Sequence, residues 1–121
     1  MKKYEIARKI EALFKEASGA KYGGKLQDTR IYFGGKAWCY MPQGGKGYTG
    51  KRTILTDINA RDYCEYANED TITCTFEGQV YECLNYGIDN YRLMNKLNDM
   101  LQEYGYYYEM GHAWNFSLYE V

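Results

Sequence analysis

The stretch "YFGGKAWCY", residues 32–40, places two glycines between two runs that are rich in aromatic residues. The stretches "TFEGQVYEC" at 75–83 and "YEMGHAWNF" at 108–116 repeat its pattern: a residue-glycine pair, then Lys, Gln or His, then Ala or Val, then Trp or Tyr. Glycine supplies the positive φ that two-residue hairpin turns need. The pattern indicates either internal duplication or convergence on one turn chemistry. We expect three β-hairpins, with turns at Gly34-Gly35, Glu77-Gly78 and Met110-Gly111.

Two further stretches have the 3.6-residue period of amphipathic helices. The first ends at Gly19, which can adopt the left-handed conformation of a helix C-terminus. The second lies between Asp89 as N-cap and Gly105 as stop, and Asn59 as N-cap predicts a short helix over 60–67. The apolar faces of the two long helices are Ile6, Ile10, Leu13, Phe14 and Ala17, and Leu93, Leu97, Met100, Leu101 and Tyr104.

The expected order of elements along the chain is α–ββ–α–ββ–α–ββ. A helix and a hairpin cannot bury their apolar faces alone, so three such units would share one core. We therefore expect a single α+β domain over residues 1–121, with a mostly antiparallel sheet of three hairpins and helices packed on it. The length of 121 residues suits one domain.

Composition and cysteine spacing favour a cytoplasmic protein without a cofactor. No apolar run approaches the roughly 18–20 residues of a membrane span, and the first residues, "MKKYEIARKIEALF", carry charge throughout, unlike a signal peptide. The four cysteines show no C-x-x-C spacing and have no nearby histidine, which disfavours a metal site. In the second expected hairpin, Cys74 opposes Tyr81 and Ile72 opposes Cys83, a diagonal arrangement of the two thiols that suits buried cysteines better than a disulfide.

The sequence signals no catalytic function. His112 is the single histidine, and no serine or cysteine stands in a nucleophile motif. The stretch "GKGYTGK", residues 45–51, matches the first seven positions of a P-loop. Arg52 then stands where a P-loop has the Ser or Thr that holds magnesium, so we reject nucleotide hydrolysis. We expect a non-enzymatic binding module.

Charge is distributed unevenly along the chain, although the total is −1. Residues 1–52 hold twelve Lys and Arg against four Asp and Glu, a net of +8, and residues 53–121 hold three against twelve, a net of −9. The basic half contains "GGK" three times, interleaved with aromatic residues. Gly-Lys loops can follow a phosphate backbone while aromatic rings stack on unpaired bases. We expect this half to contact single-stranded or loop nucleic acid, or a nucleic-acid-handling protein, through phosphate contacts Lys25, Lys36, Lys46, Lys51 and Arg52 and stacking residues Tyr48 and Trp38.

Two alternatives remain open. The two halves could neutralise each other within the domain or across a head-to-tail homo-oligomer. Alternatively, the acidic, tyrosine-rich half could engage a basic groove on another protein. In size, lack of catalytic motifs and surface character the chain resembles the small inhibitors that phages and mobile elements carry against host defence, of which anti-CRISPR proteins are one group; this likeness is one of composition, not of a motif. The expected protein-binding residues are Glu65, Glu69, Asp70, Glu77 and Glu82.

Overall fold

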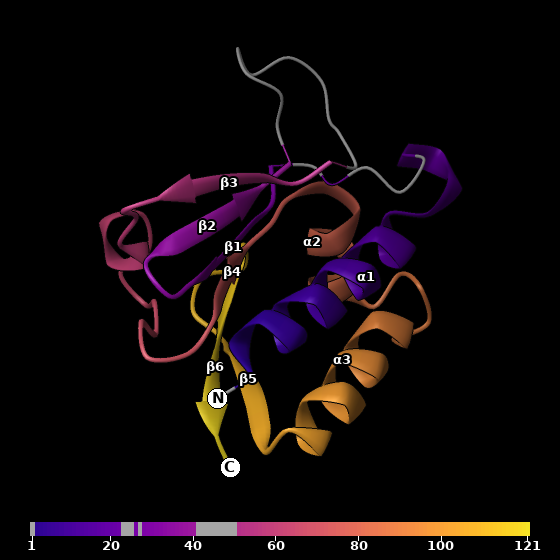
Figure 1. Cartoon of the computed structure of the whole chain (residues 1–121). Helices are drawn as coiled ribbons and strands as arrows, with labels where there is room; N and C mark the ends of the chain where they lie inside the picture. The colour runs from indigo at the N-terminus through magenta and orange to yellow at the C-terminus, as the bar shows by residue number, and fades with distance from the viewer. Residues whose placement is uncertain (1, 23–25, 27, 41–50) are drawn as a thin grey trace.

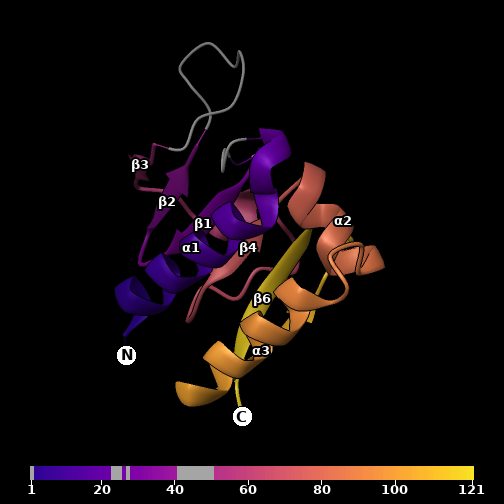
Figure 2. The ribbon, with the colours of Figure 1, turned by 90° about the vertical axis from the view of Figure 1, so that its right-hand side faces the viewer.

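Three helices cover one face of a six-stranded antiparallel sheet (Figures 1 and 2). The computed structural model describes residues 2–22, 26, 28–40 and 51–121. The strand order is β3-β2-β1-β4-β6-β5, which confirms the expected α+β class. The elements are α1 (Lys3–Tyr22), β1 (Arg30–Phe33), β2 (Lys36–Cys39), β3 (Thr53–Thr56), the 3-10 helix η1 (Ala60–Asp62), β4 (Thr73–Thr75), α2 (Gly78–Tyr86), α3 (Arg92–Glu103), β5 (Tyr106–Met110) and β6 (Asn115–Glu120).

The first expected hairpin is confirmed in its turn and its register. Phe33 pairs with Lys36 and Ile31 with Trp38. Gly34 and Gly35 both have positive φ, 59° and 74°, as a two-residue turn with the twist of the flanking strands requires. The next strand, β3, pairs with β2 and extends the sheet to its edge.

The second expected hairpin is wrong. Only Thr73–Thr75 forms a strand there, and the chain from Gly78 to Tyr86 is helical. β4 is an inner strand that pairs with β1 and β6, two strands from distant parts of the chain. Val80, Cys83 and Leu84 follow helical spacing and are buried, so this short apolar run fits a helix as well as a strand. Gly78 still has a positive φ of 64°, but at the start of α2 instead of in a hairpin.

The third hairpin forms with a longer turn and a different register. Tyr107 pairs with Tyr119, and Glu109 pairs with Ser117. A two-residue turn at Met110-Gly111 would instead pair Tyr107 with Trp114 and Glu109 with His112. Asn115 closes the turn: its side-chain Oδ1 accepts from the His112 N–H at 2.6 Å, and its backbone oxygen accepts from the Gly111 N–H at 3.1 Å. The side-chain bond makes a four-residue loop more favourable here than the tight turn.

The helices α1 and α3 follow the sequence prediction. α1 is interrupted at Gly19, where φ is 57°, and one more turn follows. The Asp89 carboxylate accepts from the Leu93 N–H at 2.8 Å and caps α3, which begins at Arg92, and Gly105 follows its end with a φ of 81°. The Asn59 side chain accepts from the Arg61 N–H at 3.0 Å, but the helix it caps is the short η1 and does not reach residue 67.

The hydrophobic core lies between the helices and one sheet face, and a second, smaller cluster lies on the opposite face. There the segment 57–71, defined here as the covering segment, places Ala60, Cys64 and Ala67 against side chains of β1 and β2. All four cysteines are buried and unpaired. Within the described residues, no helix combines the length and the apolar character that a membrane span needs.

Candidate protein-binding surface

The described residues of the basic segment do not form the expected stacking surface. Trp38 is only 1% exposed and packs against Phe33 and Tyr4, so its ring is not available to a base. The Arg52 guanidinium lies 3.5 Å from the centre of the Trp38 ring and binds Glu11 through two hydrogen bonds of 2.9 and 3.0 Å. Arg52 therefore stabilises the fold instead of offering its charge to phosphate. Lys25, Lys46 and Tyr48 lie outside the described residues.

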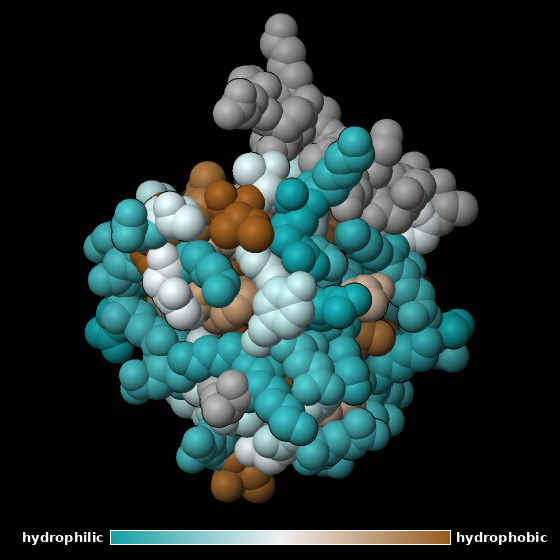
Figure 3. Space-filling view, viewed as in Figure 1, coloured by the Kyte–Doolittle hydropathy of each residue, from teal (hydrophilic) through white to brown (hydrophobic). Residues whose placement is uncertain are grey.

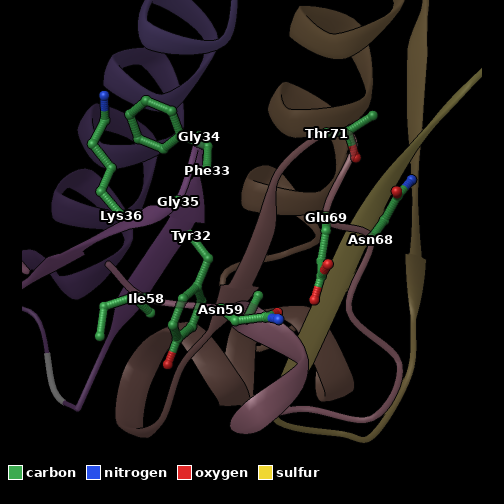
Figure 4. Close-up of a pocket in the computed structure, with 11 residues that line it drawn as sticks. Tyr32, Phe33, Gly34, Gly35, Lys36, Ile58, Asn59, Asn68, Glu69 and Thr71 are labelled. Carbon is green, nitrogen blue, oxygen red and sulfur yellow. The ribbon is translucent and has the colours of Figure 1, made fainter. Parts of the chain in front are cut away.

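Lys36 lies at the rim of a hollow of about 330 Å³ between the β1–β2 turn and the covering segment. Its ammonium is 4.7 Å from the centre of the Phe33 ring. Figure 4 shows Tyr32 and Glu69 on opposite sides of this hollow, whereas Lys36 extends away from both. Lys51 is exposed just before β3. The described residues that line the hollow beside Lys36 do not include Lys51.

Within the described chain, ion pairs of 4.0 Å or less join Glu11 to Lys15 and Arg52, Glu16 to Arg92 and Lys96, and Glu65 to His112. Each of these pairs either lies within one charge half or joins a basic-half acid to an acidic-half cation. Glu16 thus forms ion pairs with two of the three Lys and Arg residues of the acidic half. All five expected protein-binding acids are exposed, and among them only Glu65 has such a partner in the described chain: Glu65, Glu69, Asp70, Glu77 and Glu82.

A partly exposed group of aromatic side chains lies beside Glu65 and Glu77. We define the aromatic cluster as Tyr63, Tyr66, His112 and Trp114, which come from the covering segment and from the β5–β6 turn. His112 stacks on Trp114, with ring centres 4.9 Å apart and an angle of 10° between planes, and Tyr66 meets His112 edge-on, also at 4.9 Å. Tyr63 and Tyr66 are each 52% exposed. The charge and the tyrosine content of the sequence pointed to the acidic half as a binding surface. Only the fold brings Tyr66 next to His112 and the Trp114 ring stacked on it.

A second hollow, of about 250 Å³, separates Tyr63 from Trp114. The Arg30 guanidinium carbon lies 5.4 Å from the centre of the Tyr63 ring, and its Nη1 donates to the Tyr32 hydroxyl at 3.4 Å. Asp28 and Glu77 also line the hollow. Burial raises the pKa of the Tyr32 hydroxyl although Arg30 opposes the shift, so this group stays protonated at neutral pH. A hollow lined by both aromatic and charged side chains can receive a side chain of a partner.

Buried hydrogen bonds hold the covering segment on the sheet. The hydroxyls of Thr73 and Ser117 lie 2.8 Å apart, and the Asn68 N–H donates to both, at 2.9 and 3.2 Å. The Ser117 hydroxyl also donates a hydrogen bond to the Tyr66 carbonyl oxygen at 3.1 Å. The Thr71 hydroxyl donates to the Leu118 carbonyl at 2.6 Å. The backbone at Tyr66 is therefore held in place before any partner binds, which reduces the entropy lost on binding.

Gly111 allows the covering segment to approach the β5–β6 turn. A Cβ at this position would lie 2.7 Å from the Tyr66 Cβ and 2.8 Å from the Asn115 side-chain nitrogen. From the other side, the Asn85 side chain of α2 donates to the Ala113 carbonyl at 2.7 Å. The turn is thus held between α2 and the covering segment, with Gly111 at the point of closest contact.

We predict that Gly111→Ala separates Tyr66 from the turn and destabilises the protein by about 1–3 kcal/mol, the usual cost of overpacking. Urea denaturation gives the free energy of unfolding, and near-UV circular dichroism reports the packing of the aromatic cluster. Gly34→Ala is the matched control, because a Cβ there meets nothing within 4 Å, so that only backbone strain changes. An unchanged aromatic spectrum in Gly111→Ala would contradict the close contact.

Comparison of the chain with protein-family models, with curated proteins and with solved structures finds no match. The proposal for its function therefore depends on the surface itself.

Proposed function

We propose that the chain is a cytoplasmic, non-catalytic protein-binding module whose aromatic cluster docks on a basic surface of another protein. The observation that carries this proposal is the exposure of Tyr63 and Tyr66 beside His112 and Trp114, on a segment held to the sheet by partly buried hydrogen bonds. Tyrosine and tryptophan contribute much of the affinity at protein interfaces, because they bury a large area at a low entropy cost.

The acids around the cluster favour a basic partner. Glu65 and Glu69 lie on the covering segment, and Glu77 lines the hollow between Tyr63 and Trp114. Asp70 follows Glu69, whereas Glu82 lies on α2 in the helix layer, so we exclude it from the surface. Exposed charges of one sign increase association rates with an oppositely charged partner and select against acidic surfaces. A groove that binds nucleic acid is one such basic surface, and occupying it would inhibit the protein that carries it.

The alternative proposal, direct binding of nucleic acid by the basic segment, is weaker. Trp38 is buried in the core and Arg52 is paired with Glu11, so both are already engaged within the fold. Among its described residues, Lys36 is half-exposed with its ammonium over the Phe33 ring, and Lys51 is exposed. The two proposals predict opposite results for nuclease treatment and for oligonucleotide binding.

The test begins with affinity capture by the immobilised chain from a native lysate, with and without nuclease. We expect the chain to capture one protein with a basic surface, and this capture should persist after nuclease treatment. Capture should be lost with Tyr63→Ala and with Tyr66→Ala, and retained with Tyr86→Ala. Tyr86 is the matched control, since it is 66% exposed on α2 but lies outside the cluster. Capture that is lost with nuclease, or that survives both cluster variants, contradicts the proposal.

The captured protein is then purified for quantitative binding. Each cluster variant should weaken binding at least about tenfold, because removing a hot-spot side chain costs roughly 2 kcal/mol or more. Glu65→Gln with Glu69→Gln and Glu77→Gln should slow association and reduce its dependence on salt. Fluorescence anisotropy with a single-stranded oligonucleotide at about 50 mM salt provides the comparison, because electrostatic phosphate contacts are strong at that concentration. Tight oligonucleotide binding there would favour the alternative.

A further inference from the structure

The strand β3 forms one edge of the sheet and is unusually suited to pairing with another strand. It pairs with β2 on one side, and among the described residues no strand pairs with its other side. Its residues Thr53, Ile54 and Thr56 are exposed, with Ile54 at 52%. Figure 3 shows a hydrophobic patch over this strand. Edge strands that avoid association usually carry a charge or a proline, and residues 53–56 have neither.

The opposite edge of the sheet differs in this respect. β5 carries Glu109, an exposed charge, near the middle of the strand. A charge at this position opposes the addition of a further strand, because pairing would place it against another strand. The two edges therefore are not equivalent, and β3 is the one available for pairing.

The register of the first hairpin determines which groups of β3 point outward. Phe33 and Lys36 flank a two-residue turn, so even-numbered residues of β2 direct their backbone groups toward β1. The Gly35 oxygen accepts from the Ile58 N–H at 2.9 Å, which confirms that odd-numbered residues there face the β3 side. Because the hydrogen-bonding direction alternates along a strand, Ile54 and Thr56 direct their N–H and C=O groups away from the sheet.

We propose that two copies of the chain associate through antiparallel pairing of β3 with β3, about a two-fold axis at Ile54. A two-fold axis perpendicular to the sheet keeps the helices of both copies on the same face and pairs residues whose numbers sum to 108. Ile54 then opposes Ile54 of the second copy in a hydrogen-bonded pair. Thr56 opposes Arg52 of the second copy in the same way, and the outward backbone groups of the edge are satisfied.

Charge complementarity favours a second copy over an unrelated strand. Lys51 precedes the strand and Asp57 follows it, so antiparallel pairing brings Lys51 of one copy to the end of the contact where Asp57 of the second copy lies, and symmetry repeats this at the other end. Both residues are exposed in the single chain. Opposite charges that face each other across strands are stabilising, and the apolar Ile54 pair lies between them. The strand is thus complementary to itself in hydrogen bonding, in charge and in its apolar side chain.

The contact is small, since it rests on one four-residue strand. We expect a dissociation constant on the order of 10–100 µM, typical of interfaces below the standard size. Analytical ultracentrifugation of the full chain across this range should show a reversible monomer–dimer equilibrium. A chain that stays monomeric up to about 500 µM, well above that range, would overturn the proposal.

Substitutions at the edge test the register. Ile54→Lys should weaken dimerisation at least about tenfold, since an edge lysine opposes strand pairing, whereas Tyr107→Lys, on the other edge, should leave it unchanged. Lys51→Glu places like charges opposite each other and should weaken the dimer about tenfold, and adding Asp57→Asn should restore part of the loss. Asparagine suits the positive φ of 54° at position 57, so the second change adds little strain.

Amide hydrogen exchange provides a readout that does not depend on any substitution. In wild-type protein the N–H groups of Ile54 and Thr56 should exchange more slowly as concentration increases through the dissociation constant. The Tyr108 N–H on β5, which points away from β6 at the opposite edge, provides the comparison and should show no concentration dependence. A dimer that leaves Ile54 and Thr56 unprotected, or that survives Ile54→Lys, would assign the contact to another surface and contradict the pairing of β3.

Discussion

Replacing Phe116 with alanine is expected to lower the free energy of unfolding by about 3–5 kcal/mol, the usual cost of removing a large buried aromatic side chain. Phe116 is fully buried on β6 and faces the helices. Its ring centre lies 6.0 Å from that of Phe14 on α1, 5.6 Å from Phe76 and 5.1 Å from Tyr108 on β5. The side chain thus joins the helix layer to two parts of the sheet, and the void would lie between elements that cannot all close on it.

Denaturation by urea at neutral pH gives the loss, and Phe116→Leu is the matched control. Leucine keeps most of the volume and should cost much less, about 1–1.5 kcal/mol, because volume-conserving apolar changes are tolerated best. Equal losses for alanine and leucine would show that the aromatic contacts, and not the cavity, determine the cost. A loss below about 1 kcal/mol for alanine would contradict the central position of Phe116.

The second large effect is expected at Glu11, which binds Tyr40, just before residues 41–50, and Arg52, shortly after them. Its carboxylate accepts from the Tyr40 hydroxyl at 2.6 Å and from Arg52 at 2.9 and 3.0 Å, and only 12% of the side chain is exposed. Glu11→Ala leaves a buried hydroxyl and a partly buried guanidinium without their acceptor. We expect a loss of about 2–3 kcal/mol, below the cost for a fully buried pair because 24% of the Arg52 side chain reaches solvent.

The contribution of Glu11 should depend on pH. Burial raises the pKa of this carboxyl, but the hydrogen bonds from Arg52 and Tyr40 outweigh it, so the pKa in the folded protein lies below its ordinary value. A lowered folded pKa means that the stabilisation is present above the unfolded value of about 4.3 and is lost as pH falls through the folded value. The difference in unfolding free energy between wild type and Glu11→Gln should therefore shrink as pH falls from about 6 to below 4.

Urea denaturation at several pH values measures this difference, with Glu109→Gln as the control, because Glu109 is exposed on β5 and forms no ion pair within the described residues. The control should differ from wild type by little at any pH. A difference for Glu11→Gln that is constant, or that increases toward acid, would contradict the role of the charged carboxylate.

The candidate surface was only partly predictable. The exposed acids and the excess of tyrosine in the second half are visible in the composition, so the general location was open to inference. The assembly of the aromatic cluster was not, because Tyr66 and Ser117, which hold the covering segment and β6 together, are 51 residues apart. For the same reason Arg52 reads as a free cation in the sequence, although its partner Glu11 lies 41 residues away.

The sequence by itself determined the elements whose causes are local. Positive φ at Gly34 and Gly35 specifies the first turn, and the apolar spacing that ends at Gly105 specifies α3, because turn geometry and helical periodicity involve only neighbouring residues. Tertiary structure alone decided the state of residues 78–86. The few apolar residues of this segment fit both the alternation of a strand and the spacing of a helix. The segment forms a helix because β1 and β6 already occupy both sides of β4. A strand formed from 78–86 would have had no free edge of β4 to pair with, whereas a helix satisfies its own backbone and buries Val80, Cys83 and Leu84 in the core.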